Sequence, residues 1–328
     1  MTAWTETSEM RRKGIGFFGL IWAVLFGTMA GLTPVTSLVS LGWLSRRMRE
    51  QALVSAGLPG MTPGWILGEP GGRLLSRALG GLAANIREGI KMAFSLMIAA
   101  FPFALVWLLS WWAGWENSFS KGYEQAFIGP ILGLAGVAIF SLVMIWHPMA
   151  LAHQAVEGRT LAFFEWRRVR SAVRHAGFGY FLVSLATVVF ALPLFAGRGL
   201  VVFASDIFPG FDSMSAAEVV ALSGQIALVK AGYAFVALMI LRGWLAKVYA
   251  RAVARALGGP DAGLWVNSAL AEGASGGRRS WKLTHWLRAV LLTIVWFGLA
   301  AQIYVGQFLN YDWYIWLTHP FWMLPWPG

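Results

Sequence analysis

The sequence predicts an all-α fold, a polytopic transmembrane helical bundle. Its 328 residues are 58% hydrophobic and only 12% charged, about half of the charged fraction of a soluble domain. Apolar stretches of roughly twenty residues recur along the chain, and each is long enough to cross a bilayer. The 26 lysines and arginines gather in clusters between these stretches, as membrane topology requires. We therefore attribute the net charge of +11 to the basic residues that orient the chain in the membrane. No nucleic-acid partner is predicted.

The first apolar stretch, residues 14–44, is broken by Thr33 and Pro34 and followed by the basic run at residues 46–49. A hairpin bent at Pro34 has two arms of about fifteen residues, roughly 22 Å each, which is shorter than a hydrocarbon core of about 30 Å. We therefore predict a re-entrant hairpin with Pro34 as its hinge. The alternative is one kinked helix that crosses the membrane, which gives six spans in total.

Five further stretches predict full membrane spans, at about residues 92–112, 127–146, 178–195, 224–244 and 287–304. Two segments between the spans, 73–91 and 162–176, combine apolar residues with arginines at helical spacing. We expect them to lie on the membrane surface as basic amphipathic helices. The last segment, 305–328, contains four tryptophans and neither lysine nor arginine. We expect it to be an aromatic C-terminal tail that docks with partners.

The basic residues are distributed unevenly along the chain. Segments 45–91, 154–177 and 246–288 hold seven, five and seven lysines and arginines, whereas loops 113–127 and 196–217 hold one each. The positive-inside rule places the three basic segments in the cytoplasm and the C-terminus outside. Because no signal-peptide pattern is present, we predict a multi-pass protein of the bacterial inner (cytoplasmic) membrane.

The chain is expected to form a single integral membrane domain, 1–328, with an internal repeat. Residues 42–57 (GWLSRRMREQALVSAG) are similar to residues 243–258 (GWLAKVYARAVARALG), and residues 146–159 follow the middle descending helix in the same way. This pattern predicts three helix-pair units, 14–112, 127–195 and 216–304. The alternative is that all helices leaving the membrane toward the cytoplasm share tryptophan and arginine.

The sequence SLGWLSRRMREQALVSAGLPG, followed by NIREGIKMAFSLMIAAFPF, resembles the bacterial and archaeal multi-pass family called domain of unknown function 4013. Residues 147–170 are similar to a second half seen in larger relatives, and the resemblance covers mainly residues 14–180. The chain departs from the family at Trp43, where tyrosine is usual, and by a longer loop. The resemblance implies a multi-pass membrane fold, and it transfers no activity and no functional residue.

Cations inside or beside the predicted spans are the candidate functional residues. Lys230 lies within the apolar run IALVKAGYAFVALMI, where an ionisable group is costly and often functional. Snorkelling of its side chain to the headgroups or a structural ion pair is the alternative. Arg242 lies about one turn inside the predicted cytoplasmic surface, where we expect headgroup contact. The other candidates for contact with anionic lipid headgroups are Arg46, Arg47, Arg167 and Arg168.

The sequence shows no catalytic constellation. It has no cysteine, no glycine-rich phosphate loop and no HExxH motif, and almost no carboxylate lies inside a predicted span. We therefore predict no enzymatic activity, no metal and no cofactor. Ligation of haem or chlorophyll by His147 or His153 is the alternative, and it is disfavoured because two residues six positions apart do not share a helix face.

These observations favour a non-enzymatic membrane protein, a scaffold, assembly factor or accessory subunit of a larger membrane complex. Its predicted partners are membrane lipids, including anionic headgroups, and other membrane protein subunits. The alternative is a lipid or small-molecule transporter with a cavity near Lys230 and the broken first stretch. A membrane enzyme that acts on lipids is a third hypothesis.

Overall fold

The computed structural model describes residues 16–68, 77–115, 127–273, 285–310, 316 and 319–327. Parts of the predicted segments 45–91, 246–288 and 305–328 lie outside these residues. Within the described part of the chain, every regular element is a helix. The predicted all-α fold is therefore confirmed.

Among the described residues, four helices are long and apolar enough to cross a membrane: α5 (Gly80–Trp115), α9 (Phe178–Val202), α11 (Ala216–Leu257) and α13 (His285–Asn310). A fifth candidate span consists of α6 (Ile128–Val143) and α7 (His147–Glu157), which are bent by 46° relative to each other. Each of the five predicted spans falls on one of these elements. The second span differs from the predicted single helix. Helix α6 has only 16 residues, about 24 Å, and the chain turns before it continues as α7.

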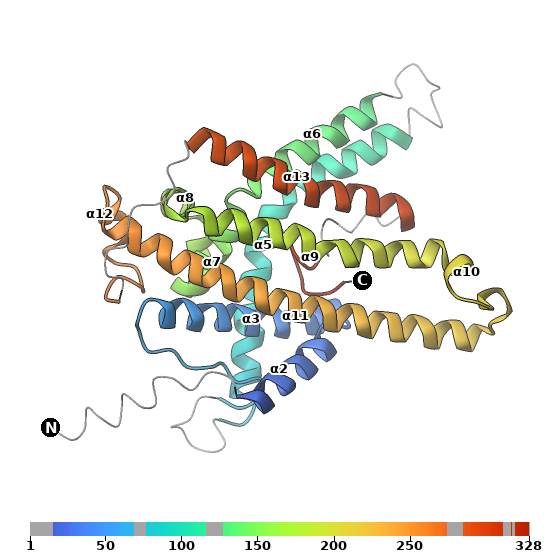
Figure 1. The fold of residues 1–328 in the computed structure, drawn as a ribbon, viewed down its shortest axis with the longest axis horizontal. Helices are drawn as coiled ribbons and strands as arrows, with labels where there is room; N and C mark the ends of the chain where they lie inside the picture. The colour runs from blue at the N-terminus through green and yellow to red at the C-terminus, as the bar shows by residue number, and fades with distance from the viewer. Residues whose placement is uncertain are drawn as a thin grey trace.

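Helices α9, α11 and α13 run side by side along the long axis of the molecule (Figure 1). The C-terminal ends of α3 (Pro34–Ser55) and α11 lie at one end of this axis, together with α8 (Trp166–His175), α12 (Ala262–Trp265) and the start of α13. We call this end the basic end, because the arginine-rich segments gather there. The short helix α10 (Ala204–Ile207) lies at the opposite end.

The first apolar stretch forms two helices, α2 (Phe17–Ala30) and α3, which meet at a short turn. Pro34 is the first residue of α3, where proline is favoured, and the amide of Thr36 donates to Thr33 Oγ1 at 3.1 Å. The hydroxyl of Ser40 donates to the carbonyl of Gly27 at 3.2 Å, so the helices pack together beyond the turn. The break lies at the predicted hinge, and the re-entrant path itself stays a prediction.

Helices α3 and α5 cross almost backbone to backbone. A Cβ atom at Gly42 would lie 1.8 Å from the carbonyl oxygen of Asn85, and one at Gly89 would lie 1.9 Å from that of Leu38. Only glycine permits this approach, as at other close helix crossings in membranes. The predicted surface helix 73–91 is not separate from the next span, because both belong to α5 from Gly80 onward. Figure 1 shows α5 bent along its length, and Pro102 within it is the expected cause.

The three similar segments, 42–57, 146–159 and 243–258, lie on α3, α7 and α11, and these helices pack against one another in all three pairs. Their buried side chains form the core near the basic end: Leu44, Met48, Ala52, Met149, Ala152, Val156, Ala246, Tyr249 and Val253. The three predicted units therefore contribute equivalent segments to one core. Their origin by triplication stays a prediction.

The C-terminal tail folds back into the bundle. Trp316, Trp322 and Met323 are buried. The ring centroid of Trp322 lies 4.9 Å from that of Phe140 and 4.6 Å from that of His147. The described part of the tail thus fills the protein's own core, and its docking with partners stays a prediction.

Candidate functional site

Arg242 is buried within the span formed by α11. Its side chain is enclosed by protein, with the residue only 7% exposed, and its Nη1 atom has no hydrogen-bond partner among the described residues. No ion pair found among those residues involves it. A buried cation is costly unless it is paired, and an ionisable residue inside a membrane protein is a functional candidate by default. The structure thus surrounds Arg242 with protein groups, and its predicted contact with headgroups stays a prediction.

Arg242 lines a cavity of about 40 Å³ between α7, α9, α11, α13 and the tail. On α11 it shares a face with Leu238 and Leu245, which also line the cavity, because residues three and four apart lie side by side on a helix. One water needs about 10–15 Å³. The cavity therefore has room for a small ion or for a few waters.

Three further residues that line this cavity have a buried polar atom without a hydrogen-bond partner among the described residues: His147 at Nδ1, Ser184 at Oγ and Trp296 at Nε1. The indole nitrogen can only donate, as can the guanidinium of Arg242. The imidazole of His147 hydrogen-bonds the backbone of Trp322, which leaves the other nitrogen of the neutral ring as an acceptor. The unpartnered donors of Arg242 and Trp296 therefore suit an acceptor that carries negative charge.

His147 is the first residue of α7, directly after the bend that ends α6. A helix N-terminus carries a partial positive charge and exposed amides, and broken membrane helices present such ends to anionic groups. Pro148 and Leu151, in the first turns of α7, line the cavity with His147. The dipole of α7 and the charge of Arg242 therefore both make the electrostatic potential in the cavity more positive.

A second buried arginine, Arg198 on α9, lines a smaller cavity of about 10 Å³. Gln302 on α13 and His319 of the tail also line it, and the Oε1 atom of Gln302 and the Nδ1 atom of His319 have no hydrogen-bond partner among the described residues. Burial, and next the positive charge of Arg198, lower the pKa of His319 to about 3, so this imidazole is neutral. The tail thus lines both cavities that contain a buried arginine.

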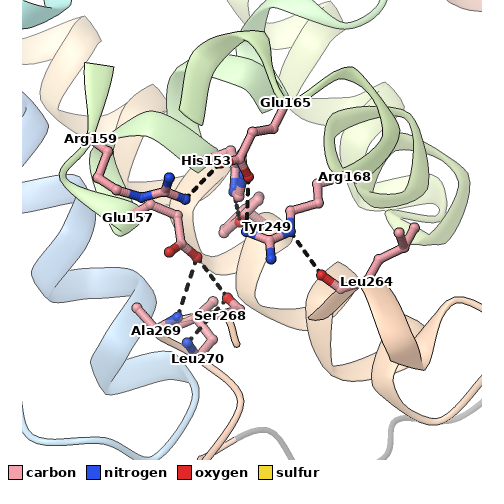
Figure 2. Close-up of polar contacts among 10 residues, drawn as sticks. All are labelled: His153, Glu157, Arg159, Glu165, Arg168, Tyr249, Leu264, Ser268, Ala269 and Leu270. Atoms are coloured by element: carbon pink, nitrogen blue, oxygen red, sulfur yellow. Dashed lines mark hydrogen bonds and ion pairs between the residues drawn. The ribbon is translucent and has the colours of Figure 1, made fainter. Parts of the chain in front are cut away.

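A second polar cluster lies nearer to the basic end, and Figure 2 shows its side chains pointing toward one another. His153 is fully buried on α7, with Nδ1 2.6 Å from the Tyr249 hydroxyl of α11 and Nε2 2.9 Å from Glu165 Oε2. Arg159 and Arg168 donate to the two oxygens of Glu165 at 2.6 and 2.8 Å. These contacts join α7, α8 and α11, and every side chain in them has a partner.

Burial acts to raise the pKa of Glu165, but hydrogen bonds from His153 and Arg159 and the charges of His153 and Arg168 outweigh it. The pKa of this carboxyl group therefore lies below its ordinary value. Nearby, Glu157 Oε1 accepts from the Ser268 hydroxyl at 2.9 Å (Figure 2). The cluster therefore fixes the connector after α12 as well as α8.

The arginines predicted to contact headgroups have different surroundings. Arg46 donates to Asn85 Oδ1 at 2.9 Å, and Arg47 pairs with Glu50, so both stabilise the region around α3. Arg168 turns inward, and its Nε atom donates to the carbonyl of Leu264 at 2.8 Å.

Arg167 lies on the exposed face of α8. Lys230 is half-buried, and its Cδ atom lies 4.0 Å from the position that a Cβ atom would take at Gly197. Lys230 does not line the cavity of Arg242. Arg198 and Trp296 were not among the predicted functional residues. A lone arginine between two glycines near the end of a span was the available signal for Arg198.

Both ring nitrogens of His153 are bound by protein groups. Within the described ranges, no group of three or more histidine, cysteine or acidic residues is placed to hold a metal ion. The predictions about cofactors stay predictions.

These helices and their buried polar groups define the chain as a multi-pass, all-α integral membrane protein. No family model, curated protein or solved structure matches the chain. The resemblance to domain of unknown function 4013, the bacterial inner membrane and the orientation stay predictions.

Proposed function

We propose that this protein binds small inorganic anions within the membrane and carries them across it, with Arg242 as the central binding residue. The observation that carries the proposal is the buried guanidinium with an unpartnered Nη1 atom beside a cavity. A bound monoanion neutralises this charge and accepts its free hydrogen bond. It therefore offsets the free energy that an unpaired cation costs in a low-dielectric interior.

The second buried arginine supports passage as well as binding. Arg198 lies near the end of α9 that leads to α10, whereas Arg242 lies farther toward the basic end on α11. An ion that crosses a membrane needs successive sites that each hold it weakly enough to release it. Two cationic sites lined by the same tail segment provide such a succession, and displacement of Phe321 and Trp322 would open the cavity of Arg242.

The direct test is halide flux from vesicles that contain the full chain. Arg242→Met keeps the length of the side chain and removes its charge, and we expect at least a tenfold loss of chloride efflux. The matched control is Arg251→Gln, which removes an exposed cation from the same helix and should leave the flux unchanged. Absence of flux from the unmodified protein, or equal flux from Arg242→Met, would overturn the proposal of transport.

Binding has its own readout. An anion that binds only the folded protein stabilises it by about 1.4 kcal/mol at ten times its Kd. Chloride or bromide, added at constant ionic strength against a large organic anion, should therefore raise the unfolding temperature of the unmodified protein and of Arg251→Gln. The rise should be absent in Arg242→Met. An equal rise in all three proteins would assign the effect to the surface instead of the cavity.

The predicted role as a scaffold or accessory subunit stays a prediction. The aromatic tail gives this role little support, because Trp316 and Trp322 pack inside the same chain. The lack of enzymatic activity also stays a prediction.

A further inference from the structure

A larger pocket, separate from the anion cavity, opens at the basic end. Its volume is about 290 Å³, and it lies between α8, the starts of α9 and α13, and the bend after α6. It shares no lining residue with the cavity of Arg242. It is therefore a second site, whose occupancy does not depend on the function proposed above.

The pocket has apolar walls and cationic residues. Val173, Phe181, Ala289 and Leu292 provide apolar surface, and Arg170, Arg174 and Arg288 also line it. No aspartate or glutamate is among the lining residues. An apolar pocket lined by three guanidinium groups is complementary to a molecule with an anionic head and an apolar body.

The three arginines are held in different ways. Arg174 Nη2 pairs with Asp261 Oδ2 at 2.6 Å, and Arg288 Nη1 donates to the carbonyl of Arg174 at 3.0 Å. Arg170 is exposed and forms none of the ion pairs found among the described residues. Asp261 thus compensates the charge of Arg174 within the protein, while Arg170 is available to a ligand.

The surrounding aromatic residues indicate the depth of this pocket. Trp166 begins α8, Phe178 begins α9 and Trp286 lies in the first turn of α13, and all three are exposed. Exposed tryptophan near the ends of membrane helices is typical of the interface between lipid and water. The pocket therefore lies where phospholipid headgroups lie.

We infer that this pocket binds one anionic phospholipid of the surrounding bilayer. Its phosphate contacts Arg170 and Arg288, and its glycerol backbone and first methylene groups pack against Val173, Phe181 and Leu292. We expect a membrane lipid and not free phosphate, because the remaining lining residues are mostly apolar. They stabilise a bound acyl or glycerol group but not a small soluble anion.

Binding is tested with the full chain in nanodiscs of phosphatidylcholine, titrated with phosphatidylglycerol and read by native mass spectrometry. Arg170→Gln should weaken the tightest phosphatidylglycerol site about fivefold, the change expected for one base near an anionic headgroup. The matched control is Arg167→Gln on the same helix, which removes an exposed arginine that does not line the pocket. Its affinity should stay within twofold of the unmodified protein.

A second variant fills the pocket and keeps its charges. Ala289→Trp should abolish the tight phosphatidylglycerol site while the arginines remain. If this variant does not fold, the comparison of Arg170→Gln with Arg167→Gln decides alone.

Three results would overturn the inference. Equal weakening by Arg170→Gln and Arg167→Gln would indicate diffuse attraction to a basic surface. Equal affinity for phosphatidylcholine and phosphatidylglycerol would remove the role of the headgroup charge. Displacement of phosphatidylglycerol by millimolar inorganic phosphate would assign the pocket to a soluble anion.

Discussion

Two buried polar clusters lie on the same pair of helices and differ in how their polar groups are satisfied. His147 on α7 and Arg242 on α11 line a cavity, and each has a nitrogen without a hydrogen-bond partner among the described residues. Farther along the same helices, His153 and Tyr249 bind each other, and Glu165 binds the other imidazole nitrogen. The clusters therefore differ in the pairing of their atoms, and the carboxylate of Glu165 belongs only to the satisfied one.

The difference has a thermodynamic meaning. A satisfied buried network stabilises the fold and specifies one arrangement of helices, whereas a buried unpartnered cation lowers stability. Such a group persists where function needs it, as strained or destabilised sites generally do. The comparison predicts opposite responses of the two clusters to substitution.

The largest effect is expected at the satisfied cluster. His153→Ala leaves the Tyr249 hydroxyl buried without its partner and breaks the link to Glu165, which should lower the free energy of unfolding by about 3 kcal/mol. Tyr249→Phe removes only the hydroxyl and should cost about 1 kcal/mol. Denaturant titration of the purified protein in mild detergent measures both. A His153→Ala protein as stable as the original would show that this network does not hold the helices together.

A smaller effect of opposite sign is expected at the open cluster. Arg242→Met removes a buried unpaired charge and should raise the free energy of unfolding by about 1 kcal/mol, measured in the absence of halide. The control is Arg168→Met, which removes a guanidinium bound to Glu165 and to the carbonyl of Leu264. That control should lose about 2 kcal/mol. If Arg242→Met lost as much as Arg168→Met, Arg242 would be a structural residue like Arg168.

The smallest effect concerns pH and the satisfied cluster. Because the pKa of Glu165 is lower in the folded protein than its ordinary value of 4.5, its charged form contributes stability that is fully present above about pH 5. This contribution is lost as the pH falls through the lowered pKa. Glu165→Gln should reduce the loss of unfolding temperature between pH 6 and pH 4, as followed by scanning fluorimetry. An unchanged pH profile in this variant would assign the acid sensitivity to other carboxylates.

The location of the helices followed directly from the sequence. The apolar runs, the break at Thr33 and Pro34 and the amphipathic pattern of α8 all appear in the fold as expected. These are local properties, because the transfer of a segment into lipid and the start of a helix depend on neighbouring residues. The similar residues 42–57 and 243–258 lie on α3 and α11, which pack together, although the similarity predicted only repeated units and not this contact.

The candidate site was predictable only in part. Arg242 was recognised as a cation near a span, but its expected partner was a lipid headgroup. Lys230 was preferred because its surrounding run is more apolar, although it does not line the cavity. Trp296 and Arg198 were not singled out, since tryptophan and a lone arginine at a span's end are common in membrane proteins.

The sequence by itself determined that this chain is a helical membrane protein, where its apolar spans lie, and where its charges cluster, because these depend on the solvation of contiguous residues. Only the tertiary structure decided which buried charges are paired. His153 meets Tyr249 and Glu165 through contacts between three helices, while Arg242 meets a wall made partly by the tail. Hydrogen-bond satisfaction is a property of atoms brought together from distant parts of the chain, and composition and periodicity do not encode it.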